Sequence, residues 1–176
     1  MRTLDVGCGL RKAAGAIGID KDPNTQTDVI HDLNHFPYPF TYNEFDEIIC
    51  NHVLEHLDDF EKVMNELHRI TRNGGIIRIR VPHYTGVAAW GHTGHKRAFS
   101  AHIANCIRIS MGTKFYVDKT SLHYLLYTDR DACLRNRILS AIIDRILNTN
   151  IKFSDRFLGY WIGGIMELYM ELKVLK

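Results

Sequence analysis

A short apolar run that breaks into a glycine turn lies almost at the amino terminus of the chain. It reads Leu4-Asp5-Val6-Gly7-Cys8-Gly9. Glycine adopts positive φ values without steric cost and lets a ligand approach where a Cβ would block it. In an open parallel sheet, ligands bind at the carboxyl ends of strands, near the point where strand order reverses. The stretch therefore predicts a first β-strand followed by a nucleotide-binding turn.

The residues after this turn indicate which nucleotide it would bind. A dinucleotide-binding turn needs a third glycine three residues after the second, and Lys12 stands there instead. Residues 10–16 leave little room for the helix whose amino terminus binds a pyrophosphate. Asp20 ends the next apolar run, Ile17–Asp20, where it can accept hydrogen bonds from a ribose diol. These features favour an adenosyl ligand without phosphates and argue against a nicotinamide-dependent oxidoreductase.

Several motifs, in their order along the chain, resemble those of class I S-adenosylmethionine-dependent methyltransferases of the type 11 group. They are the glycine turn, Ile19-Asp20, Asp32-Leu33 and Asn51-His52-Val53-Leu54-Glu55-His56. The resemblance runs from residue 4 to about residue 82, and more loosely to the C-terminus. It implies an enzyme with an α/β fold: a Rossmann-like, mostly parallel sheet with an antiparallel C-terminal strand inserted beside the fifth. The helix after the first strand is shortened.

The resemblance also implies S-adenosylmethionine as the cofactor and assigns its binding to a set of residues. They are Asp5, Gly7, Gly9, Asp20, Asp32, Leu33 and Asn51. Asp32 is assigned to the adenine amino group and Leu33 to the neighbouring backbone contact, although Asp32 can also be read as a plain loop acid. The implied acceptor is a small molecule, such as a sugar or a lipid-linked intermediate. A non-catalytic adenosyl-binding or scaffold protein of the same fold is the alternative function.

The apolar pattern predicts the remaining elements of such a fold. Helical spacing predicts a helix from Phe60 to Ile70 that is capped by Asp58 or Asp59 and stopped by Asn73-Gly74-Gly75. Further predicted strands span 27–33, 45–50, 76–81, 114–126 (with a short helix beginning near residue 120) and 168–175, and an amphipathic helix spans 132–147.

The predicted fifth strand, residues 76–81, is unusual for a central strand. Arg78 and Arg80 alternate with its apolar residues, whereas a strand buried on both faces is apolar throughout. One face of this strand is therefore predicted to meet water or acidic partners.

Length and composition set the outer bounds. A chain of 176 residues predicts one domain, with a cofactor-binding half over 1–82 and a substrate side over 83–176. The net charge of +2 gives no electrostatic case for nucleic-acid binding. The four cysteines are widely spaced, which favours reduced thiols in a cytoplasmic protein. No apolar run reaches the length of a membrane span.

Histidines are the candidates for catalysis. Methyl transfer from a sulfonium is an in-line displacement, so positioning supplies much of the acceleration. A hydroxyl or carbon acceptor would also benefit from a general base, and His56 and His95 are predicted for this role. His56 belongs to a motif that is often structural. His95, with Lys96 and Arg97, can instead bind an acidic substrate group.

Metal binding is not predicted. Four histidines between residues 83 and 112 suggest zinc by number: His83, His92, His95 and His102. Their spacing is loose and no cysteine pair supports them. The sequence therefore predicts that no metal is bound.

The C-terminal third predicts an association surface over residues 132–164. Aromatic residues from Phe153 to Trp161 follow closely on a helix rich in isoleucine, and Arg145, Lys152 and Arg156 lie nearby. Large apolar patches mark contacts, so either a homodimer or an acidic membrane surface is predicted to bind here. The alternative is that these aromatic residues pack under the sheet as core.

Overall fold

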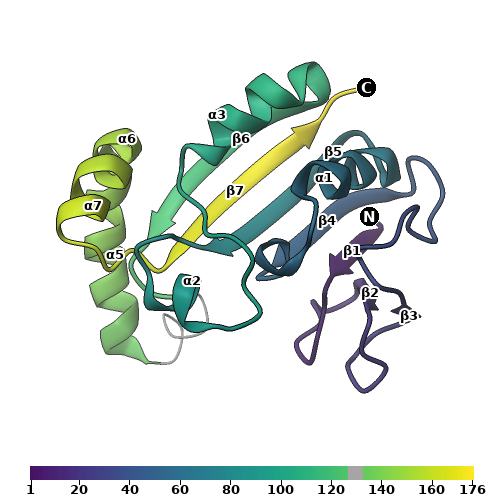
Figure 1. The fold of residues 1–176 in the computed structure, drawn as a ribbon, viewed down its shortest axis with the longest axis horizontal. Helices are drawn as coiled ribbons and strands as arrows, with labels where there is room; N and C mark the ends of the chain where they lie inside the picture. The colour runs from purple at the N-terminus through teal and green to yellow at the C-terminus, as the bar shows by residue number, and fades with distance from the viewer. Residues whose placement is uncertain (127–132) are drawn as a thin grey trace.

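The computed structural model describes residues 1–126 and 133–176. A seven-stranded sheet with the order β3-β2-β1-β4-β5-β7-β6 crosses the molecule (Figure 1). Its strands are β1 (Thr3–Val6), β2 (Ile17–Asp20), β3 (Val29–Ile30), β4 (Phe45–Asn51), β5 (Thr71–Pro82), β6 (Phe115–His123) and β7 (Glu167–Val174). The first five strands are parallel, and β7 runs antiparallel between β5 and β6. The predicted sheet, with its C-terminal strand inserted beside the fifth, is confirmed.

The connection between β1 and β2 contains turns and no helix. The carboxylate of Asp5 accepts the Ala13 N–H at 2.7 Å, and the Gln26 side chain accepts the Lys12 N–H at 3.2 Å. These bonds fold the short segment back on the sheet edge. The third strand is also shorter than predicted, because only Val29 and Ile30 pair with β2.

Helix α1 (Phe60–Ile70) begins where the sequence predicts and ends before the predicted stop. The Asp59 side chain accepts the Lys62 N–H at 3.0 Å and caps the helix. The prediction that Asn73-Gly74-Gly75 stops the helix is wrong, because Thr71 already pairs with Phe45 of β4 and begins β5. Sheet pairing ends this helix before the glycines are reached.

The second half of the chain supplies most of the helices. They are α2 (Val87–Gly91), α3 (Ile103–Ser110), α5 (Leu134–Thr149), α6 (Ile151–Phe153) and α7 (Gly159–Trp161), with a 3-10 turn η2 (Gly112–Lys114) and a short π-helix η3 (Ser154–Leu158). A further 3-10 turn, η1 (Leu54–His56), lies in the first half, between β4 and α1. The helix predicted near Thr120 is absent from the described β6, since this strand stays paired with β7 to His123. Ala132, the predicted start of the long helix, lies outside the described residues. Figure 1 shows α5 and α7 at the end of the sheet where β7 begins, with β1–β3 at the opposite end.

The core lies against the middle of the sheet. Its fully buried side chains include Leu4, Val6, Ile19, Ile48, Ile77, Ile79, Leu168 and Met170. Arg78 pairs with Glu47 at 2.6 Å, and Arg80 pairs with Glu167 at 2.9 Å. Of the two surroundings predicted for one face of the fifth strand, water or acidic partners, the structure shows acidic partners. Across the two described ranges, we find no helix with the length and apolar character that a membrane crossing requires.

Candidate active site

The residues predicted to bind the cofactor gather along one edge of the sheet. Asp20 ends β2, Asn51 ends β4, and the turn at Gly7 and Gly9 follows β1. Asp32 and Leu33 come just after β3, and Asp5 lies within β1. Because these strands are parallel and adjacent in the order β3-β2-β1-β4, their carboxyl ends lie side by side.

The two glycines of the turn have different surroundings. Gly7 has φ 66° and donates its N–H to the Ile19 carbonyl at 2.8 Å. A Cβ on Gly7 would lie 2.4 Å from Cγ2 of Val53, so the segment after β4 packs directly on this glycine. Gly9 has φ 50° and no heavy atom within 4 Å of an added Cβ. Its backbone is therefore open to a ligand.

The carboxylates at this edge are held by backbone groups. Asp20 accepts N–H bonds from Gly9 and Asp22, both at 3.0 Å. Each oxygen keeps acceptor capacity, because a carboxylate oxygen accepts two bonds. Burial raises the pKa of Asp5, which is turned toward Ala13. The Asn34 N–H bond lowers the pKa of Asp32 below its ordinary value.

A buried ionic network that the sequence did not predict lies beside Asn51. His52, at φ 52°, places Nε2 2.9 Å from Glu167 Oε1 and Nδ1 3.3 Å from Glu55 Oε1. Arg80 donates to the other Glu167 oxygen at 2.9 Å. Burial by itself would lower the pKa of His52, but Glu167 and Glu55 outweigh it and raise this pKa to about 9. His52 is therefore charged at neutral pH.

The motif gave a partial signal for this network. His52 and Glu55 are three residues apart, a spacing that brings side chains together in a helical turn. Glu167 is 115 residues from His52, so no local pattern could have indicated it.

The structure brings together His56 and His95, the two predicted catalytic residues, and adds His92. The ring centroids are 4.7 Å apart for His56 and His95, 5.3 Å for His56 and His92, and 4.7 Å for His92 and His95. These rings, with His52 and Glu55, line a cavity of about 630 Å³. Burial lowers the pKa of His95 below the ordinary value.

The neighbours of His95 hold the loop in place. Lys96 forms an ion pair with Asp58. Arg97 donates to the Leu57 carbonyl at 2.8 Å and to the Asp58 carbonyl at 2.7 Å. These contacts occupy the two cations, so they tie the segment after α2 to the segment before α1.

The other two histidines considered for zinc lie elsewhere. His83 is fully buried, 2.9 Å from an Asp155 oxygen through Nε2 and 2.9 Å from the Thr85 hydroxyl through Nδ1. His102 is exposed immediately before α3. The four histidines that suggested zinc by number are therefore not the set that meets in space.

Comparisons with known proteins agree with the methyltransferase resemblance of the sequence motifs. Residues 4–79 match the model of a family described as a methyltransferase domain. A SAM-dependent methyltransferase from Archaeoglobus fulgidus has a similar structure, with a TM-score of 0.60, 19% identity, and coverage of 98% of this chain and 85% of the other. One from Mesorhizobium loti has a TM-score of 0.58, 15% identity, and coverage of 98% and 90%. Curated protein sequences gave no match.

One similar structure contains the cofactor. It is a Haemonchus contortus phosphoethanolamine N-methyltransferase in complex with S-adenosyl-L-methionine, with a TM-score of 0.61 and 15% identity. The match covers 99% of this chain and 48% of the other.

The strand order and the candidate site at the carboxyl edge are those of the class I methyltransferase fold, whose enzymes use S-adenosylmethionine as their cofactor. Within this fold, residues 4–79 match the methyltransferase-domain family that the sequence motifs resemble.

Proposed function

We propose that this methyltransferase acts on a small-molecule acceptor, such as a sugar or a lipid-linked compound, bound in the cavity beside β4. The position of this cavity supports the proposal most directly. Asn51 ends the strand that borders the glycine turn, and the cavity lined by His52, Glu55 and the clustered histidines begins one residue later. In this proposal residues 1–82 hold the cofactor and residues 83–176 build the acceptor side of a single domain.

The residues at the sheet edge fit an adenosyl ligand. The open space at Gly9 admits a ligand that a Cβ would exclude, and Gly7 lets the neighbouring segment close on the turn. We assign Asp20 to the ribose diol, Asp32 to the adenine amino group and Leu33 to the adjoining backbone contact. Asp5 and Asn51 complete the site.

S-adenosylmethionine supplies a methyl group on a sulfonium, so the protein mainly has to align donor and acceptor. His56 and His95 can take a proton from the acceptor. In each ring Nδ1 lies near a backbone carbonyl, at 3.0 Å from Gly94 O and 3.2 Å from Ala89 O respectively. Because a carbonyl only accepts, Nδ1 carries the proton and Nε2 is the basic nitrogen.

A non-catalytic adenosyl-binding protein is the second candidate. Residues 10–16 form turns in place of the helix that would close one pocket wall, which favours weaker enclosure of the ligand. The two functions differ in turnover and not in binding.

Substitution of Asp20 tests the cofactor site. Asp20→Ala is expected to weaken S-adenosylmethionine binding by about 1–3 kcal/mol, because ribose hydroxyls would lose their acceptor. Calorimetry measures the affinity, and Asp118→Ala removes an exposed carboxylate on β6 as the control. Equal affinity in wild type and a folded Asp20→Ala protein would remove Asp20 from the site.

Turnover separates the two candidate functions. We expect a metabolite screen, scored by S-adenosylhomocysteine release, to identify an acceptor that is small, with sugars and lipid-linked compounds included in the set. Tight cofactor binding with no release for any acceptor would favour the non-catalytic protein.

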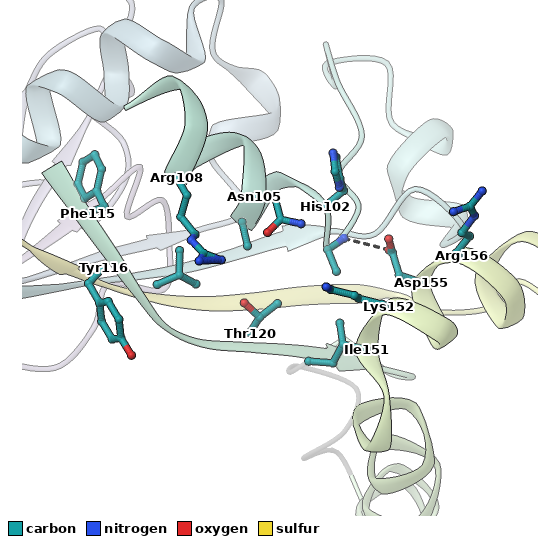
Figure 2. A pocket seen from close by; sticks show the side chains of 13 residues that line it. His102, Asn105, Arg108, Phe115, Tyr116, Thr120, Ile151, Lys152, Asp155 and Arg156 are labelled. Atoms are coloured by element: carbon teal, nitrogen blue, oxygen red, sulfur yellow. Dashed lines mark hydrogen bonds between the residues drawn. The ribbon is translucent and has the colours of Figure 1, made fainter. Parts of the chain in front are cut away.

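We also propose that residues 133–164 contact an anionic membrane surface. Exposed apolar side chains follow one another here: Leu134, Ile138, Ile142, Ile146, Phe153, Phe157, Tyr160, Trp161 and Ile162. Their exposure argues against the alternative that they form core. Figure 2 shows Arg108 and Lys152 pointing into a neighbouring cavity of about 660 Å³. Aromatic residues beside cations suit an interfacial contact.

A cytoplasmic location is part of this proposal. All four cysteines are free in the structure, and Cys133 is exposed. Reduced thiols of this kind are usual in the cytoplasm.

A further inference from the structure

We infer that His56, His92 and His95 form a binding site for one divalent transition-metal ion of the zinc type. The three histidines offer ligand nitrogens that all lie within 4.8 Å of one another. They come from η1 and from the loop after α2, which the Lys96 and Arg97 contacts hold against each other. This inference goes beyond the proposed methyl transfer and does not depend on it, but an ion bound here would replace the general-base role proposed for His56 and His95.

Two of the rings are already oriented as metal ligands usually are. A metal-bound histidine commonly donates its other ring N–H to a carbonyl or carboxylate, which fixes the tautomer and the ring plane. His56 and His95 donate Nδ1–H to Gly94 O and Ala89 O. Their Nε2 atoms are therefore available as lone-pair donors.

The exposed His92 is the ligand that can adjust most easily when one ion binds all three histidines. Nitrogens that share a zinc ion each lie about 2.0–2.1 Å from it, so they lie within about 4.2 Å of one another. The three nitrogens here lie within 4.8 Å of one another. His92 is exposed, and its Nδ1 accepts a single hydrogen bond, from Gly94 N–H at 3.1 Å. Glycine at position 94 leaves room for the rings, because an added Cβ would lie 3.2 Å from both His56 and His92.

A buried carboxylate adds a charge that favours a cation here. Glu55 is fully buried, and its Oε1 lies 4.0 Å from His95 Nε2. Within the described residues neither of its oxygens accepts a well-formed hydrogen bond. His52 supplies one positive charge near Glu55, but His52 also pairs with Glu167. A metal ion beside His95 would be attracted by Glu55.

The donor set indicates the kind of ion and its use. Imidazole nitrogens suit zinc, cobalt, nickel and copper, whereas magnesium and calcium prefer oxygen. Three protein ligands with an open fourth position are the pattern of catalytic zinc sites. An acceptor hydroxyl bound at that position would lose its proton more easily. A nitrogen bound to the ion cannot also take a proton, so this role replaces that of a general base.

Cobalt(II) binding tests the site without any enzymatic reaction. The full-length protein is treated with a chelator, desalted and titrated with CoCl₂ while visible absorption is recorded. We expect saturation at one equivalent, with the absorption bands of low-coordinate cobalt. His92→Ala removes an exposed ligand and should weaken binding more than about tenfold, since even a lost outer partner costs roughly 10–100-fold.

His102→Ala is the matched control, because it removes an exposed histidine outside the cluster. It should bind cobalt as wild type does. His95→Asn is the second variant, and circular dichroism shows whether each variant is folded. Absence of saturable binding in the wild type, or equal weakening by His92→Ala and His102→Ala, would overturn the inference.

Discussion

Gly7 and Gly9 belong to one turn yet serve different purposes. Both have positive φ, a backbone conformation that by itself favours glycine. Gly7 is also closed in by Val53, whereas Gly9 faces open space. The first glycine is therefore required by packing and the second leaves room for a ligand.

Alanine at each position should separate these purposes. Gly7→Ala is expected to destabilise the fold by roughly 2–4 kcal/mol, because overpacking adds to the cost of positive φ. Gly9→Ala should cost about 1–2 kcal/mol, from φ alone, and weaken S-adenosylmethionine binding. Denaturant unfolding and calorimetry measure the two effects. Equal loss of stability in both variants would show that the Val53 contact relaxes freely.

His52 links stability to pH. Its pKa is about 9 in the folded protein, against an ordinary value of 6.5. Because the folded pKa is raised, the stabilisation is complete below pH 6.5 and is lost as the pH rises through about 9. Over this interval the free energy of unfolding should fall by on the order of 3 kcal/mol.

His52→Asn tests this link. Asparagine tolerates the positive φ at this position, so the backbone is preserved. The variant should be less stable at pH 6.5, since Glu55 loses the His52 charge and Glu167 keeps only Arg80. Its free energy of unfolding should also vary less with pH. Urea unfolding at a series of pH values measures how the free energy of unfolding changes with pH, with His102→Asn as the control. An unchanged slope in His52→Asn would assign the pH dependence to other groups.

At the scale of the element, α1 shows which end of a helix its sequence controls. Asp59 caps the start through a bond to Lys62 N, a local feature. The end comes at Ile70, where β4 recruits Thr71 into the sheet. Local capping decides the start, and tertiary pairing decides the end.

Asp58 and Asp59 form a matched pair for testing the cap. Asp59→Ala should destabilise the protein by about 1 kcal/mol, because the Lys62 N–H loses its acceptor. Asp58→Ala loses only an exposed ion pair with Lys96, which is worth about 0–1 kcal/mol. Thermal unfolding compares them. A larger loss for Asp58→Ala would mean that its loop contact matters more than the cap.

At the scale of the whole molecule, the two ends of the sheet differ. One end carries the strand edge of β1–β4 that we propose binds the cofactor, and the other carries the exposed apolar residues of α5–α7 (Figure 1). A protein that bound a membrane through α5–α7 would keep its strand edge in water. This arrangement would suit the lipid-linked acceptor included in our proposal.

Vesicle sedimentation tests the membrane proposal. Wild type should pellet with anionic vesicles, and a smaller fraction should pellet with neutral vesicles. High salt should also reduce the pelleted fraction, since it screens the attraction between basic side chains and anionic lipids. Phe157→Ser/Trp161→Ser should reduce binding. Tyr42→Ser is the control, because Tyr42 is 73% exposed, against 71% for Trp161, and lies outside this surface.

Mass measurements across a dilution series test the other predicted partner, a second copy of the chain. A concentration-dependent dimer that ignores vesicles would replace the membrane with a second copy of the chain. A monomer that ignores vesicles would remove both.

The local features of this protein could be predicted from its sequence. The glycine turn, the acid at the end of β2 and the helix over 60–70 each depend on residues a few positions apart. Arg78 and Arg80 likewise revealed a polar strand face before their acidic partners were known. Backbone conformation and side-chain periodicity are set over such short distances, so they leave a readable pattern.

Contacts between distant segments were decided only by the tertiary structure. The number of histidines between residues 83 and 112 suggested one set, and their loose spacing argued against it. Folding of the loop after α2 instead joins His92 and His95 to His56 and leaves His83 with Asp155. Glu167 reaches His52 only because β7 inserts beside β5. The periodicity of residues 134–146 predicted an apolar face, and the tertiary structure left it exposed. A pattern shows that a face or a ligand exists, whereas its partner depends on which segments the sheet brings together.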